Sequence, residues 1–197
     1  MPDPFAPGST YADALPALPT PRLLLRPLTE DDDAALVHLF SDERSLETWG
    51  TPGFASLDDA RAYRAALEEG FGRRVLFIWG VFEQETGTLV GVGILTRWAQ
   101  NHRRVDMGYY LSSPYWGRGY ATEAAGALLR FAFGTLGVHR IEAEVVPGNT
   151  GSERVLGRLG FTHEALLKER LWGFDGPEDS NLFRLLEPDF SPQERQA

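Results

Sequence analysis

The order of the predicted elements favours an α+β domain, built on one mostly antiparallel sheet of about seven strands with about four helices on its faces. Two kinds of apolar pattern predict it. Alternating or continuous apolar runs mark the strands, and apolar residues at helical spacing mark the helices. The elements follow one another as strand, two helices, three strands, helix, strand, helix and two strands. A length of 197 residues fits one domain of this kind.

The N-terminal half contains the first strand, two helices and a hairpin. Thr29 and Ser56 are typical N-cap residues, and each is followed by carboxylates in the first helical turn, where they suit the helix dipole. The sequence Glu85-Thr86-Gly87 reads as the turn of the hairpin. The predicted elements are the strand 22–26, the helices 29–40 and 56–67, and the paired strands 75–82 and 89–98.

The C-terminal half continues with a strand, a long helix, a strand, a helix and two final strands. Gly160 follows the second of these helices and is a natural C-cap. The predicted elements are the strand 105–111, the helix 121–136, the strand 139–146, the helix 149–159 and the strands 161–172 and 181–186.

The domain is expected to span residues 20–190. Five prolines between residues 2 and 19 break any regular element, which predicts a flexible N-terminal tail over residues 1–19. Residues 191–197 are expected to form a C-terminal tail.

Composition excludes several functions. A net charge of −9 argues against general nucleic-acid binding. The absence of a long apolar run and of a signal peptide predicts a cytoplasmic protein with no membrane partner. There is no cysteine, so disulfides, thiolate metal sites and an acyl-cysteine intermediate are excluded. No metal is expected.

The segment Ser113–Ala124 is the most informative part of the chain. Gly117 and Gly119 lie between a strand and the start of a long helix. Glycines allow the backbone to approach a phosphate closely, and the helix N-terminus offers free N–H groups to it. The segment therefore predicts a phosphate-bearing ligand. Tyr120 and Ala121 stand where a nucleotide P-loop would have Lys and Ser/Thr, and Thr122 breaks the dinucleotide pattern G-x-G-x-x-G.

What remains resembles the acetyl-CoA loop of the GNAT N-acetyltransferases, Q/R-x-x-G-x-G/A. Gly119 takes the first glycine position and Ala121 the last small position. Trp116 replaces the usual Gln or Arg, as is typical of the RimJ/RimL-like branch. Four more motifs resemble that branch in the right order, and together they cover nearly the whole chain from about Thr20: residues 20–28, 106–111, 136–141 and 149–161.

The resemblance implies the GNAT acyl-CoA N-acyltransferase fold, acetyl-CoA as co-substrate and no metal. It implies that the pantetheine arm enters a gap beside the strand 105–111, with a β-bulge near Gly108 opening the gap. The backbone of this strand would pair with the arm. The glycine loop, residues 117–122, would hold the pyrophosphate. The residues implied to bind the cofactor are Tyr109, Tyr110, Leu111, Trp116, Gly117, Arg118, Gly119, Tyr120, Ala121, Thr122 and Asn149.

The resemblance also makes Ser152 a candidate to protonate the leaving CoA thiolate. Many GNATs use a Tyr four residues later, but that position is Leu156 here. The base that deprotonates the amine is not fixed by the sequence. Asp106 and Glu144 are the candidates carried forward, while Glu142 shares a strand face with Glu144. The histidines 139 and 163 have suitable pKa values but a structural role is expected at position 139.

The resemblance implies direct transfer of acetyl to a primary amine in a ternary complex. The amine would be a protein N-terminus or a small amine, bound near the segments 42–54 and 172–179. A non-catalytic acetyl-CoA sensor is the alternative, and a nucleotide-binding protein is a distant third. A homodimer is a reasonable expectation for this branch.

Overall fold

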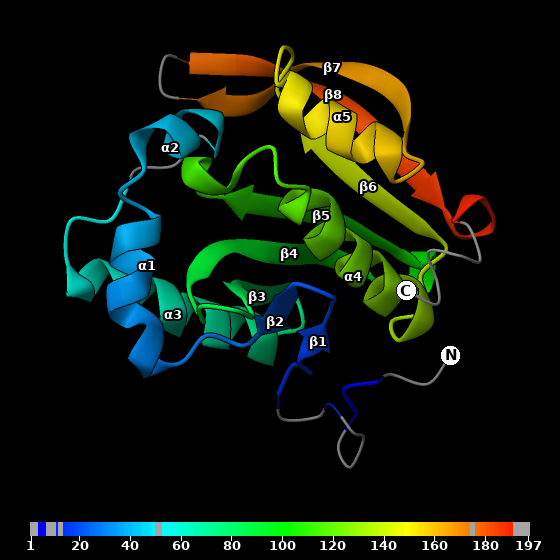
Figure 1. Cartoon of the computed structure of the whole chain (residues 1–197). Coiled ribbons are helices and arrows are strands. Elements are labelled where there is room, and N and C mark those ends of the chain that lie inside the picture. Colours follow the sequence, from blue (N-terminus) through cyan, green and yellow to red (C-terminus); the bar gives the residue numbers. More distant parts are fainter. Residues whose placement is uncertain (1–3, 7–10, 12–13, 50–52, 174–175, 191–197) are drawn as a thin grey trace.

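The computed structural model describes residues 4–6, 11, 14–49, 53–173 and 176–190. Its centre is one sheet of eight strands in the order β1-β2-β3-β4-β5-β6-β8-β7 (Figure 1). Every neighbouring pair is antiparallel except β5 and β6. The strands are β1 (Leu18–Pro19), β2 (Leu23–Arg26), β3 (Leu76–Glu83), β4 (Leu89–Ala99), β5 (Arg104–Leu111), β6 (Arg140–Val145), β7 (Thr162–Gly173) and β8 (Gly176–Leu186).

Five α-helices lie among the described residues: α1 (Asp33–Leu39), α2 (Glu43–Trp49), α3 (Leu57–Gly72), α4 (Tyr120–Gly134) and α5 (Thr150–Arg158). Ser56 caps α3 as predicted, since its side chain accepts a hydrogen bond from the Asp59 N–H. Short 3-10 helices cover Glu30–Asp32, Gln100–His102, Ser113–Tyr115 and Glu187–Asp189.

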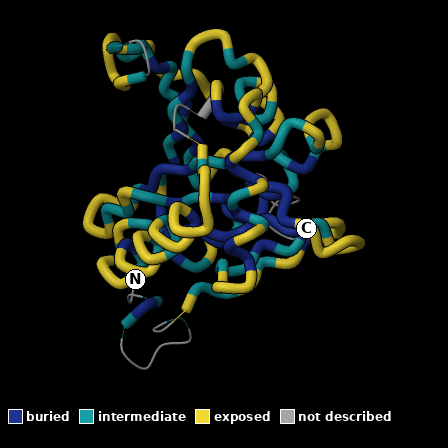
Figure 2. The backbone as a smooth tube through the Cα atoms, turned by 90° about the vertical axis from the view of Figure 1, so that its left-hand side faces the viewer, coloured by how far each residue is buried: buried dark blue, intermediate teal, exposed yellow. Residues whose placement is uncertain are grey.

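The helices form a layer on each face of the sheet. On one face α4, flanked by α5, packs on β2, β4 and β5 around fully buried residues such as Leu128, Leu129 and Ile141. On the other face α1 and α3 pack on β3 and β4 around Leu36 and Phe40. Figure 2 shows the buried central strands with exposed turns around them.

The predicted α+β class is confirmed, and three details differ. The sheet gains β1, which pairs with β2. The connection predicted over residues 42–54 contains the helix α2. The last strand begins at Gly176 rather than residue 181, because it pairs with β7 out to Gly173.

Part of the segment predicted as a flexible N-terminal tail is bound to the domain. Phe5 is buried and stacks on Phe77, with ring centroids 5.1 Å apart. The indole N–H of Trp79 donates to the carbonyl of Pro16 at 2.8 Å. The predicted C-terminal tail, 191–197, lies outside the described residues.

Candidate active site

The cleft opens where β5 and β6 part. They pair in parallel over only three positions, the last being Asp106 opposite Glu142. Beyond that pair β5 continues to Leu111 and β6 continues to Val145, but the two strands no longer pair with each other. Backbone groups on the facing edges of both strands are therefore left along a gap. A cavity of about 960 Å³ fills the gap and continues to the glycine loop and the start of α5.

The sequence expectation of a β-bulge near Gly108 is wrong. Gly108 lies opposite Ile94 in regular register with β4. The irregularity lies further along, between Thr96 and Ala99 on β4, and it places Arg97 in the left-handed region at φ 53°. The gap beside β5 therefore arises from divergence from β6, and the bulge serves to redirect the chain at Arg97.

The glycine loop has the geometry of an anion site. Gly117 and Gly119 have φ of 78° and 81°, which side-chain-bearing residues rarely adopt. The first helical bond of α4 runs from the Glu123 N–H to the Gly119 carbonyl at 3.1 Å, so the three preceding N–H groups have no helical acceptor. The hydroxyl oxygen of Thr122 is buried, and no protein partner is recorded for it within the described chain.

Contacts from distant segments hold this loop. Arg22, the residue before β2, binds the Glu123 carboxylate through its backbone N–H and its Nε, both at 2.7 Å. The same guanidinium donates to the Arg118 carbonyl at 2.9 Å. The indole N–H of Trp116 donates to the Leu111 carbonyl at 2.8 Å. Glu123 therefore forms an ion pair in addition to lying in the first turn of α4.

Asp42 ties the start of α2 to the end of β5. Its carboxylate accepts hydrogen bonds from the hydroxyls of Ser45, Ser112 and Ser113 at 2.6, 2.9 and 3.1 Å. These hydrogen bonds and one from the Ser113 N–H outweigh partial burial and lower the pKa of Asp42 to about 2. Asp42 stays ionised and fixes the entry to the glycine loop.

The start of α5 forms another wall of the cavity. The side-chain oxygen of Asn149 caps the helix by accepting from the Ser152 N–H at 3.1 Å. The phenol of Tyr109 reaches across from β5 and donates to the Ser152 carbonyl at 3.4 Å. Burial raises the pKa of Tyr109 to about 12, so it keeps its proton at neutral pH.

The cavity brings together nearly all of the predicted site. The predicted residues that line it are Asp106, Tyr109, Tyr110, Leu111, Trp116, Gly117, Gly119, Tyr120, Ala121, Thr122, Glu144, Asn149 and Ser152. Arg118 does not line it; its guanidinium lies over the Tyr115 ring, 5.2 Å from the centroid. Tyr110 contributes from its backbone side, because its phenol points to the other layer and donates to the Leu39 carbonyl.

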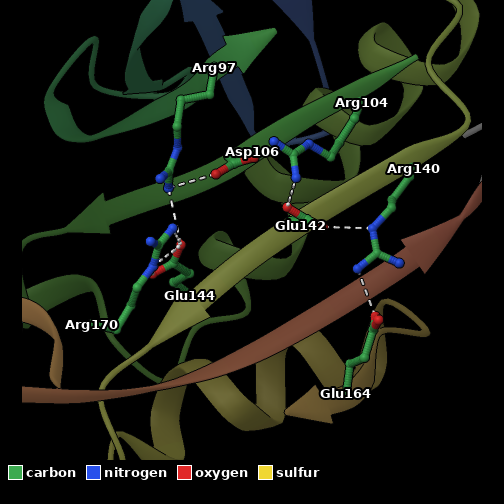
Figure 3. Close-up of polar contacts among 8 residues, drawn as sticks. All are labelled: Arg97, Arg104, Asp106, Arg140, Glu142, Glu144, Glu164 and Arg170. Atoms are coloured by element: carbon green, nitrogen blue, oxygen red, sulfur yellow. Dashed lines mark hydrogen bonds and ion pairs between the residues drawn. The ribbon is translucent and has the colours of Figure 1, made fainter. Parts of the chain in front are cut away.

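A charged cluster lies at the narrow end of the cleft (Figure 3). The Nη2 of Arg97 lies 2.6 Å from Asp106 Oδ2 and 3.2 Å from Glu144 Oε1. Arg170 of β7 binds the same Glu144 carboxylate at 3.0 Å. Asp106 is only 7% exposed, and its Oδ1 has no recorded hydrogen-bond partner within the described chain.

Burial raises the pKa of Asp106 in spite of the charge of Arg97, its nearest cation. Glu142, its neighbour across the strand pair, binds Arg104 and Arg140 at 3.1 and 2.7 Å and does not line the cavity. Glu144, by contrast, lines it. The two carboxylates share one face of β6, as predicted, but only Glu144 reaches the cavity.

Neither histidine that the sequence raised as a base lines the cavity. His139 lies 3.8 Å from Glu187, and a ring nitrogen of His163 lies 3.2 Å from the Asn181 side-chain oxygen. Across the described ranges, no group of three or more His, Cys, Asp or Glu residues is arranged to hold a metal ion. None of the described helices is long and apolar enough to cross a membrane.

The family model "Acetyltransferase (GNAT) domain" matches residues 22–162, which include β2 to β6, the glycine loop and α5. The chain belongs to the GNAT acetyltransferase family. The uncharacterized N-acetyltransferase YoaA of Bacillus subtilis is 30% identical over 177 residues, covering 88% of this chain and 98% of that protein. The [ribosomal protein uS5]-alanine N-acetyltransferase of Escherichia coli is 27% identical, covering 89% and 93%.

Solved GNAT structures agree with this placement. Mycobacterium smegmatis RimJ in complex with CoA-disulfide has 27% sequence identity and a TM-score of 0.78, with 88% of this chain and 87% of that chain covered. The predicted family, the fold and N-acetyltransferase activity are confirmed by these relatives.

The sequence does not predict the roles of three side chains of this GNAT cleft, those of Arg97, Tyr109 and Arg44, or that of Arg170, which binds the cavity residue Glu144. Arg97 and Arg170 carry no local signal, because bulges in two separate strands bring them to the same carboxylate. The Tyr109 phenol is not predicted, because the family resemblance assigns only the backbone of this residue. Arg44, which lines the cavity and lies over the Trp116 ring at 5.0 Å, falls within the predicted acceptor segment 42–54, of which residues 50–52 are not described.

Proposed function

We propose that this GNAT enzyme transfers the acetyl group of acetyl-CoA directly to a primary amine while both substrates are bound. The observation that carries the proposal is the cavity itself. It joins an anion site at the glycine loop to a buried carboxylate at the point where β5 and β6 part. Five residues of extended strand separate these ends, a distance of about 17 Å. A long, narrow thioester with a phosphate end suits this shape.

The residues present fit acetyl-CoA on two further counts. Within the part of the chain that the structure describes, no acceptor is recorded for the buried hydroxyl of Thr122 or for the first-turn N–H groups of α4, and a pyrophosphate supplies one. The unpaired edges of β5 and β6 offer backbone groups to the amides of a pantetheine arm. When bound there, acetyl-CoA supplies the activated acyl carbon.

Asp106 is the proposed base. Its carboxylate takes a proton from the acceptor ammonium. The neutral amine then forms the new N–C bond, the C–S bond breaks, and the second proton lost by the nitrogen replaces the one that Ser152 gives to the departing thiolate. An α-amino group has a pKa near 8, so a modest base is sufficient. A raised pKa suits Asp106 to this exchange, because a base closer to neutrality holds the proton more readily. Glu144 stabilises the ammonium before its proton leaves.

Two hydroxyls compete to protonate the thiolate that departs. Ser152 follows from family resemblance, and its hydroxyl belongs to a residue that lines the cavity. Tyr109 is the candidate that geometry adds, since its phenol is protonated at neutral pH and already reaches Ser152. We assign the donation to Ser152 and leave Tyr109 as the residue that holds the start of α5 against β5.

The acceptor is proposed to be a protein N-terminus or a small amine. Its test is CoA release from acetyl-CoA with short peptides that begin with Ala, Ser or Met, and with polyamines, free amino acids and aminoglycosides. Turnover of a peptide establishes N-terminal acetylation, and turnover of a small amine alone establishes a metabolic enzyme. Acetyl-CoA binding without release on any acceptor favours the alternative, a non-catalytic sensor.

A further inference from the structure

Two strand irregularities converge on the narrow end of the cleft. The register of β4 shifts between Thr96 and Ala99, and that of β7 shifts between Leu167 and Leu171. Each irregularity contains a residue other than glycine in the left-handed region, Arg97 at φ 53° and Glu169 at φ 49°. Such backbone costs free energy and tends to persist where it orients a functional group. Here both bulges deliver an arginine to one carboxylate, that of Glu144.

One nitrogen atom of Arg97 stands between the two cavity carboxylates. Its Nη2 is 2.6 Å from Asp106 and 3.2 Å from Glu144. A primary ammonium has the same charge and the same kind of N–H donors, so this position is suited to an acceptor amine. The Oδ1 of Asp106, for which no hydrogen-bond partner is recorded among the described residues, supplies one more acceptor atom for the N–H groups of an ammonium.

The arginines keep donors that the cluster does not use. Hydrogen bonds or ion pairs of Arg97 side-chain atoms are recorded only at Nη2, and those of Arg170 only at Nε and Nη2, within the part of the chain described. The two side chains are 52% and 44% exposed, so the remaining N–H groups are open to a ligand. Planar guanidinium groups with spare donors match a carboxylate.

Charge balance links these two features. The cluster holds two carboxylates and two guanidinium groups and is neutral. An acceptor with only an ammonium would displace Arg97 and leave one cation without a partner in a partly buried site. An acceptor that carries a carboxylate near its amine leaves every charge paired, because the displaced guanidinium binds that carboxylate.

We therefore infer that the acceptor of the proposed transfer is an amine with a carboxylate a few bonds away. The ammonium takes the place of Arg97 Nη2 between Asp106 and Glu144, and the carboxylate binds Arg97 and Arg170. This inference rests on the proposed function and narrows its acceptor. The same chemistry occurs in a free α-amino acid and in a peptide whose first residue is acidic.

The experiment compares acceptors that differ only in this carboxylate. Alanine is paired with alaninamide, and an Asp-Ala-Ala peptide amide with its Asn-Ala-Ala counterpart. We expect the carboxylate member of at least one pair to have a kcat/KM at least tenfold higher, and the pair that shows it identifies the source. The ratio of the two kcat/KM values in that pair should fall by at least fivefold in Arg97→Gln and in Arg170→Gln. The two acceptors of a pair differ in amine pKa, but this difference is the same for every enzyme form. It therefore cancels when the ratio for the wild type is compared with the ratio for each variant.

Arg104→Gln is the matched control. Arg104 also binds a carboxylate on the same strand pair, that of Glu142, but among the described residues it has no ion pair with Asp106 or Glu144, so its variant should keep the wild-type ratio. A ratio at or below one in both pairs overturns the inference, as does a ratio that survives both arginine variants. Calorimetric binding of the same four acceptors to the CoA-saturated enzyme decides the subsite independently. Selective binding without transfer would reject the proposed function and keep the carboxylate subsite.

Discussion

Under the proposed function, the two ends of the cleft, the glycine loop and the acceptor end where β5 and β6 part, recognise their ligands by different means. The glycine loop uses backbone N–H groups, left-handed glycines and one buried hydroxyl, all within residues 117–122. The acceptor end uses four charged side chains from β4, β5, β6 and β7. A phosphate site of the first kind is a local property of the sequence. The second kind is a property of tertiary structure, and it can change its ligand by changing a few side chains.

The largest expected effect breaks the glycine loop. Gly119→Val places a β-branched residue at φ 81°, where such residues are strained, and brings its Cβ to 3.4 Å from the Arg22 guanidinium that holds the loop. We expect acetyl-CoA binding to fall by at least about a hundredfold, a loss of ~3 kcal/mol of binding free energy. Calorimetric titration with acetyl-CoA measures it.

Gly87→Val is the matched control for that variant. Gly87 has φ 70° and lies in the turn between β3 and β4, away from the cavity. It should lose a similar amount of stability and bind acetyl-CoA normally. Normal binding by Gly119→Val would show that the phosphate lies elsewhere.

The next effect tests the acceptor end. Asp106→Asn removes the proposed base and should lower kcat/KM by roughly a hundredfold. Because burial raises the pKa of Asp106, wild-type activity should rise with pH through that raised value as the carboxylate ionises, and the variant should lose this limb. Rates from pH 4 to 9, corrected for ionisation of the acceptor amine, measure both effects.

Glu142→Gln is the control that distinguishes loss of the proposed base from loss of a carboxylate charge in the same cluster. Glu142 faces Asp106 across the strand pair and binds two arginines outside the cavity. Its variant should keep most of the activity and still show the pH limb, moved to lower pH because the charge of Glu142 helps to raise the pKa of Asp106. Equal losses of activity in Asp106→Asn and Glu142→Gln would mean that the cluster has a structural role and that Asp106 is not the base.

A smaller effect distinguishes the two candidate acids. Ser152→Ala should lower kcat about tenfold with little change in acetyl-CoA affinity, since general acid catalysis of an already good leaving group is worth less than base catalysis here. Tyr109→Phe should change kcat less than that. The reverse order, measured by steady-state kinetics on one acceptor, would move the proton donor to Tyr109.

The limits of sequence reasoning follow the same division between the two ends. Periodicity and caps predicted seven of the eight strands, and the glycine spacing predicted the tight turn before α4, because these signals are encoded by neighbouring residues. The short strand β1 has only two residues and no period to read. Arg97 and Arg170 lie 73 positions apart and meet only through two bulges, and bulge positions follow from packing rather than from composition.

The smallest expected effect concerns Asp42, which links the start of α2 to the end of β5. Asp42→Asn replaces the carboxylate that holds Ser45, Ser112 and Ser113, and should cost about 1–2 kcal/mol of unfolding free energy at pH 7 after allowance for solvent screening. The folded pKa of Asp42, about 2, lies below its ordinary value of 3.8. Its ionised form therefore stabilises the fold above pH 4, and this contribution disappears as the pH falls through 2. Urea unfolding of both proteins should show a gap at pH 7 that narrows toward pH 2. A difference in unfolding free energy that stays constant with pH would mean that Asp42→Asn destabilises the fold through altered packing and not through loss of the charge.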